Sequence, residues 1–178
     1  MFARMNGQKL IKLVMRDNIW LNNLFERVWQ ALFPDILKLN TVEVNFGTRA
    51  KRRLGSIRQA NPKDKASRTS IIITSYFKDL TVPEYILECT LAHEICHYAH
   101  GFASPMPKHS KYPHFGGIVD RELIRRGLGD KIIAQRKWLK TEWPKIIGET
   151  GVVRIRRRRV NPRSNNLKKL IRMFGLLN

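Results

Sequence analysis

Four side chains suited to metal or proton chemistry lie within residues 91–102, LAHEICHYAHGF: His93, Glu94, His97 and His100. On a helix, His93 and His97 lie one turn apart on the same face, so their imidazoles can direct nitrogens at one metal ion. Glu94 lies about 100° further round the helix, where a general base for a water molecule is needed. This HExxH pattern is typical of a zinc site with a catalytic glutamate.

A catalytic zinc site takes three protein ligands and leaves the fourth position open, so a third ligand must follow the helix. His114 is favoured, because the two glycines in HFGG let the backbone approach closely. His109, which begins HSKY, is the alternative third ligand. His100 lies about two turns beyond the first motif histidine, too far along the axis to share the site. Asp120 and Glu122 are the carboxylate candidates.

The helix that carries the motif is predicted over residues 82–100. Thr81 can cap its first turn, and Pro83 is tolerated there. Glu84 can reach back to complete a capping box. Gly101 ends the helix, since glycine readily adopts the conformation that follows many helix C-termini.

Hydrophobic periodicity and turn residues predict the surrounding elements. In the β-rich run SIIITSYF, residues 70–77, the stretch from Ser70 to Tyr76 is expected to be the edge strand beside the motif helix, to which an extended polypeptide can pair through its main chain. The other predicted elements are a helix over 18–33, a strand over 41–46, a basic strand or hairpin arm over 49–59, a loop over 60–68, a helix over 116–127 and a packed segment around Trp138 and Trp143. The fold class predicted is α+β.

This order of elements, with the segments TRAKRRLGSIR, SIIITSYF and VPEYILECTLAHEICH and a later histidine in PHFGG or KHSKY, resembles the SprT-like (Spartan-related) domain of zinc metallopeptidases. The resemblance covers roughly residues 15–130. It implies a zincin-like minimal metalloprotease domain, with a small, mostly antiparallel sheet packed on helices that include the HExxH helix. It also implies Zn²⁺ bound by His93, His97 and His114, with Glu94 as the catalytic base.

Family members associated with DNA degrade proteins bound or crosslinked to it, so the resemblance implies protein substrates near nucleic acid. Many relatives follow the domain with a four-cysteine zinc ribbon. This chain has only Cys89 and Cys96, so it lacks that ribbon. Seven positions apart on one helix, the two cysteines are about 10 Å apart, which is too far for a disulfide.

The chain carries 34 Lys and Arg against 14 Asp and Glu, a formal charge of +20. Such an excess predicts a polyanionic partner, above all nucleic acid. Two basic groups are the expected contacts: Arg154, Arg156, Arg157, Arg158 and Arg159 in the C-terminal segment, and Arg49, Lys51, Arg52 and Arg53 near the predicted strands. We therefore divide the chain into a metallopeptidase domain over 1–150 and a basic tail over 151–178.

With 178 residues and no disulfide pattern or signal-peptide-like segment, the chain is expected to be a cytoplasmic (intracellular) protein without membrane contacts. The function predicted is a zinc-dependent metalloendopeptidase acting on proteins associated with nucleic acid. The alternative is a non-catalytic basic nucleic-acid-binding protein with a structural zinc site. Tyr98 and Tyr112 are candidates for stabilising the oxyanion of the reaction.

Overall fold

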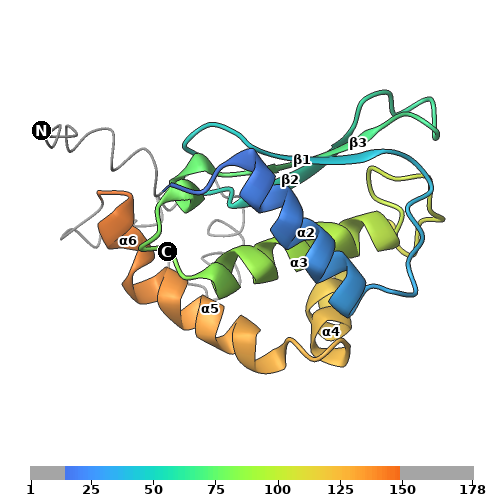
Figure 1. Ribbon diagram of the computed structural model, residues 1–178. Coiled ribbons are helices and arrows are strands. Elements are labelled where there is room, and N and C mark those ends of the chain that lie inside the picture. The colour runs from blue at the N-terminus through green and yellow to red at the C-terminus, as the bar shows by residue number, and fades with distance from the viewer. Residues whose placement is uncertain (1–14, 149–178) are drawn as a thin grey trace, which may run out of the picture.

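The computed structural model describes residues 15–148, which form a three-stranded sheet against a set of helices (Figure 1). The strands are β1 (Val42–Phe46), β2 (Gly55–Gln59) and β3 (Thr69–Ile73). The helices are α2 (Asn18–Leu32), α3 (Glu84–Ala99), α4 (Ile118–Arg125), α5 (Gly129–Thr141) and α6 (Trp143–Ile146), with short 3₁₀ turns η1 (Ser75–Lys78) and η2 (Phe115–Gly117). The predicted α+β class is therefore confirmed.

The sheet is mixed, and the prediction of a mostly antiparallel sheet is wrong. The strand order is β1-β3-β2, with β3 parallel to β1 and antiparallel to β2. Ile71 stands at the centre of this register, opposite Val44 on one side and Ile57 on the other. Alternate β3 side chains, including Ile71 and Ile73, are fully buried against the helices.

The edge strand beside the motif helix is β2, not the isoleucine-rich run 70–77 that the sequence suggested. That run forms the central strand β3, which ends at Ile73 because the chain turns into η1 from Ser75. The basic arm predicted over 49–59 is also shorter than expected. Only Gly55–Gln59 forms a strand, so Arg49 to Arg53 lie in the loop that precedes it.

Helix α2 confirms the prediction over 18–33. Asp17 caps it, since its carboxylate accepts a hydrogen bond of 2.8 Å from the Trp20 amide. Leu21, Leu24 and Phe25 recur at helical spacing and are almost fully buried, so one stripe of the helix faces α3 and β1.

Helix α3, which carries the HExxH motif, lies in the middle of the molecule (Figure 1). It packs on α2, the sheet, α4 and α5, and 12 of its 16 residues are buried. A helix covered from several sides must be apolar around most of its circumference. This is why its motif side chains stand out so clearly in the sequence.

The predicted capping box of α3 is wrong. The helix begins at Glu84, two residues later than predicted, and its N-cap is Pro83, without a side-chain cap. The Thr81 hydroxyl instead donates a 2.8 Å hydrogen bond to Asp79. The C-terminal end agrees with the prediction: His100 is the C-cap, and Gly101 follows with φ +78°.

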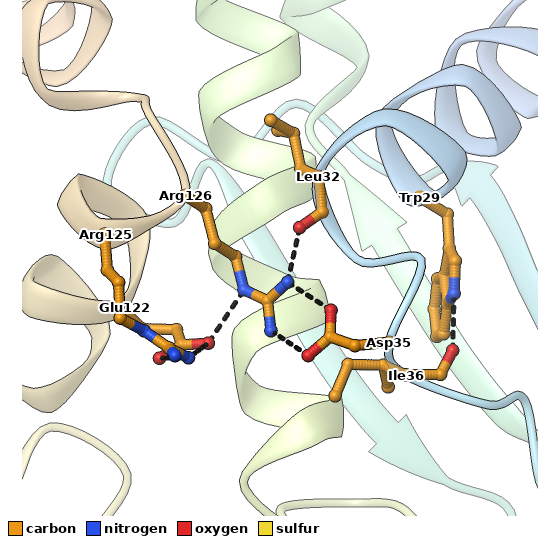
Figure 2. A network of polar contacts seen from close by, with 7 residues as sticks. All are labelled: Trp29, Leu32, Asp35, Ile36, Glu122, Arg125 and Arg126. Atoms are coloured by element: carbon orange, nitrogen blue, oxygen red, sulfur yellow. Dashed lines mark hydrogen bonds and ion pairs between the residues drawn. The ribbon is translucent and has the colours of Figure 1, made fainter.

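Helix α4 is held against the end of α2 by Arg126, which follows α4 directly (Figure 2). Its guanidinium donates to both carboxylate oxygens of Asp35, at 2.6 and 2.8 Å, and to the Leu32 carbonyl. Its Nε donates to Glu122 at 2.7 Å, and the group lies 4.3 Å from the centre of the Phe33 ring. Because Leu32 is the last residue of α2, this contact also satisfies a helix C-terminal carbonyl.

Three further predictions concern the chain as a whole. Cys89 and Cys96 are both buried and free, as expected. Within residues 15–148, no helix combines the length and the apolar character needed to cross a membrane. The basic tail predicted over 151–178, with its arginine cluster, lies outside the described residues.

Candidate metal centre

His93, His97 and His114 converge at one point of the structure. One nitrogen from each ring lies within 4.8 Å of the other two. The Nε2 atoms of His93 and His97 are 3.1 Å apart, close to the roughly 3.3 Å expected for two nitrogens bound to one tetrahedral zinc ion. The donor set and its spacing therefore fit Zn²⁺.

Two elements bring these rings together. Helix α3 places His93 and His97 one turn apart, with ring centres separated by 4.7 Å. His114 precedes η2 and stands 4.7 Å from His97 and 5.2 Å from His93 between ring centres. It is followed by Gly116 and Gly117, which have φ of +59° and +70° and turn the chain into α4.

The alternative third ligands lie elsewhere. His109 stacks on His100, with ring centres 5.2 Å apart, and its amide donates to the His100 carbonyl. Asp120 accepts a hydrogen bond from Arg136 at 2.6 Å, and Glu122 accepts hydrogen bonds from Arg125 and Arg126 at the end of α4. Among the described residues, His114 alone joins the two motif histidines within ligand distance.

Burial keeps the two motif histidines neutral. It lowers the pKa of His93 to about 4, with repulsion from His114 adding to the effect and Asp120 opposing it. It lowers the pKa of His97 to about 3, with a further contribution from the neighbouring histidines. Neutral imidazole is the form that binds a metal, so both rings offer lone pairs at neutral pH without first losing a proton.

Glu94 is 5% exposed, and its carboxylate faces the edge strand. Burial raises its pKa to about 7, although the nearby charge of Arg53 opposes this shift. A carboxylate whose pKa lies near neutrality can both accept and return a proton during a reaction. A β-carbon on Gly55 would lie 2.5 Å from Oε1 of Glu94, so strand β2 passes directly against this group.

Two cavities meet at Glu94. The larger, of about 460 Å³, is lined by all three histidines and by β2. The smaller, of about 250 Å³, is lined by Arg52, Thr90 and Gln135 among others. Arg53, Gly55, His93 and Glu94 line both, so the candidate base lies between two spaces able to hold parts of a ligand.

The tyrosines proposed for the oxyanion do not join this arrangement. Tyr98 is fully buried, and its hydroxyl donates to Asn40 and accepts from the Leu39 amide, both at 2.9 Å. These bonds exclude it from the site. Tyr112 is 56% exposed in the loop before His114 and lines neither cavity.

Cys96 lies between the motif histidines in the sequence but on another face of α3. It is fully buried, and burial raises the pKa of its thiol to about 12. Metal-bound cysteine is a thiolate, so this group is a core side chain, as predicted.

The sequence placed Arg53 in a basic group near the site, and Arg53 does lie beside Glu94, although its effect on that carboxylate was not predicted. Gly55 was not predicted as part of the site. Gly55 carries no chemical group, and its contact with Glu94 follows from sheet and helix packing, for which the sequence has no signal. Comparisons of the chain with protein-family models, with curated proteins and with solved structures give no match.

Proposed function

We propose that the protein is a zinc-dependent metalloendopeptidase that hydrolyses peptide bonds in proteins associated with nucleic acid. The observation that carries the proposal is the convergence of His93, His97 and His114 beside the buried carboxylate of Glu94. The resemblance to SprT-like domains supports it, since the same residue types have these roles there.

The three histidines would hold the ion, and Glu94 would move the proton. Zn²⁺ bound there would supply Lewis acidity, lowering the pKa of water and polarising a peptide carbonyl. Glu94 accepts a proton from a water molecule in the cavity and later delivers it to the leaving amine. Burial raises the pKa of its carboxyl group above that of an exposed glutamate, which makes it a stronger proton acceptor.

Strand β2 is the surface on which a polypeptide substrate would lie. It is an edge strand among the described residues, and its Ser56 and Ile57 line the cavity that holds the three histidines. An extended chain can add to such an edge through main-chain hydrogen bonds, which gives affinity with little sequence preference. Strand β2, and not the isoleucine-rich run, is therefore the proposed surface for main-chain pairing with the substrate.

The alternative of a structural zinc site in a non-catalytic protein has less support. Structural sites are usually closed by four protein ligands. Within residues 15–148, only three side chains converge, and they face a cavity of about 460 Å³. A centre with three ligands beside open space is the arrangement that catalysis requires.

Nucleic acid is proposed as the second partner. The chain carries a formal charge of +20, and phosphates are the polyanions that such a protein meets most often. The arginine cluster over 154–159 would hold the enzyme near nucleic acid without reading its sequence. The loop that carries Lys51, Arg52 and Arg53 lies beside the centre, since Arg53 lines the cavity of the three histidines, and would offer further contacts to phosphates.

Replacement of Glu94 by Gln tests the peptidase proposal. The variant should keep about one zinc ion per chain and lose cleavage of a protein substrate, with or without DNA, by at least about a hundredfold. Glu88→Gln is the matched control, because Glu88 lies on the same helix but pairs with Lys131 at the surface. It should retain both metal and cleavage. Equal cleavage by Glu94→Gln and the parent protein would disprove the mechanism.

A further inference from the structure

The cleft beside the centre is chemically asymmetric. On one side of Glu94, the cavity of about 250 Å³ is lined by Arg52 and Arg53, and a neighbouring hollow formed by Ala50 to Arg53 continues it. On the other side, the cavity of about 460 Å³ shares Arg53 and adds the apolar side chains Ile57, Phe102 and Pro113. A polypeptide that crossed the centre would therefore meet both arginines at one end, and Arg53 together with apolar side chains at the other.

We propose that the cationic cavity is a subsite for an acidic side chain, so that the protein selects polypeptides with Asp or Glu on one side of the bond to be cleaved and an apolar residue on the other. This inference rests on the proposed function, because it specifies the substrate class of the same site. Arg52 and Arg53 would bind the carboxylate.

These two arginines have no carboxylate partner in the described part of the chain. Within residues 15–148, neither Arg52 nor Arg53 forms an ion pair. Apart from Glu94, the remaining polar side chains that line the small cavity are neutral. Gln135, for example, donates to the Ile86 carbonyl and to the Thr90 hydroxyl. A substrate carboxylate would therefore meet two guanidinium groups, with Glu94 as the one acidic residue in the lining.

The loop that carries the arginines is held in place by its backbone. The Thr74 hydroxyl bonds both the amide and the carbonyl of Ala50, and the Thr74 amide donates to the Leu54 carbonyl at 2.9 Å. The Lys51 carbonyl accepts a 3.0 Å hydrogen bond from the indole of Trp143, a largely buried side chain. A subsite built on a fixed backbone loses less entropy when it binds its ligand.

The position and size of the cavity favour a peptide side chain over nucleic acid. The cavity is continuous with the centre, since Arg53, Gly55, His93 and Glu94 line both it and the larger cavity. Its volume of about 250 Å³ suits one side chain. Phosphates of a duplex are spread along its whole length and are bound by extended surfaces instead.

Binding, not cleavage, provides the test. The zinc-loaded Glu94→Gln protein is titrated with labelled alanine-rich peptides in which Glu and Phe flank the central bond, in both orders, and with counterparts carrying Gln for Glu. In one order, the Glu peptide should bind about fivefold more tightly than its Gln counterpart. Equal affinities for the Glu and Gln peptides in both orders would overturn the proposal.

Charge reversal identifies the residue responsible. Arg52→Glu, added to Glu94→Gln, should abolish the preference for Glu and favour a Lys counterpart. Lys63→Glu changes the charge equally in the exposed 60–68 loop and should leave the preference unchanged. Zinc content and circular dichroism show whether each variant is folded. If Arg52→Glu weakens binding of a DNA duplex but leaves the peptide preference intact, the arginines serve nucleic acid and the proposal fails.

The two proposals fail in different ways. A parent protein that cleaves no substrate while its Glu94→Gln form keeps the Glu preference would disprove the peptidase but support the subsite. A parent protein that cleaves through Glu94 but shows no such preference would disprove the subsite alone.

Discussion

Gly55 and Glu94 are in such close contact that a β-carbon on the glycine would lie 2.5 Å from the carboxylate oxygen Oε1 and 3.0 Å from Cγ2 of Thr90. The edge strand thus limits how far the carboxylate can move toward β2. The position of the Glu94 carboxylate therefore depends on the absence of a side chain at Gly55 in β2, as well as on helix α3, which carries Glu94.

Gly55→Ala should lower kcat by about ten- to a hundredfold while zinc remains bound, because the atoms nearest to the added methyl group belong to Glu94 and Thr90 and not to the histidines. Steady-state kinetics and metal analysis on the same preparation measure both effects. Gly129→Ala is the matched control, since the nearest atom to its β-carbon would be 4.0 Å away. An unchanged kcat in Gly55→Ala would show that Glu94 is free to move.

His114→Ala should weaken zinc binding by more than about a hundredfold, since it removes one of three ligands. His109→Ala should leave zinc affinity near that of the parent protein, because His109 stacks on His100 away from the centre. Competition with a chromogenic chelator gives both affinities. The reverse result would make His109 the third ligand.

Arg126→Ala should lower the free energy of unfolding by about 2 kcal/mol, because it leaves the Leu32 carbonyl without its partner and removes the Arg126 contacts with Asp35 and Glu122 (Figure 2). Arg125→Ala is the neighbouring control. Arg125 is mostly exposed and also pairs with Glu122, so its loss should cost less than about 0.5 kcal/mol. Urea unfolding at neutral pH compares the two. Equal losses would show that the contacts of Arg126 with α2 add nothing.

The ion pair of Asp35 should make stability depend on acid pH. Hydrogen bonding to Arg126 lowers the pKa of Asp35 to about 2 from an ordinary value near 4. The stabilisation is therefore complete above the unfolded pKa and is lost as the pH falls through the folded one. Asp35→Asn should reduce stability by less than about 1 kcal/mol at pH 6, since Asp35 is more than half exposed, and the difference from the parent should shrink as the pH falls from 4 to 2. A difference at pH 2 as large as that at pH 6 would contradict this origin.

Deletion of residues 152–178 removes nine basic residues and no acidic one. If this segment contacts phosphates, the plot of log affinity for DNA against log salt should become shallower, by roughly one unit for each phosphate that the segment neutralises. Fluorescence anisotropy with a labelled duplex at several salt concentrations gives the slope. An unchanged slope would exclude the segment from nucleic-acid binding.

Local patterns predicted the single elements well. Helical spacing of Leu21, Leu24 and Phe25 located α2, and the HExxH motif together with Gly101 located α3 and its end. The HFGG motif also singled out the histidine that completes the cluster. Each of these signals lies within a few residues of the feature that it predicts.

Long-range pairing could not be predicted in the same way. The run Ile71–Ile73 has the same composition in a central strand as in an edge strand, so only its pairing with both β1 and β2 shows that it is central. The capping box at Thr81 failed because Asp79, outside the motif, takes the hydroxyl hydrogen bond. The approach of Gly55 to Glu94 depends on how β2 and α3 pack against each other. Neither segment has a sequence pattern that indicates this packing.

The separation of His97 from His114 along the chain has a consequence for folding. Sixteen residues, 98–113, run between them, so an ion bound to both would tie the end of α3 to the start of α4 and close the segment into a ring. Part of the free energy of zinc binding would then stabilise the folded state. The time for which this segment resists a protease would therefore increase with the zinc concentration. A metal-free copy of the proposed peptidase would in this way be degraded more readily than a zinc-loaded one.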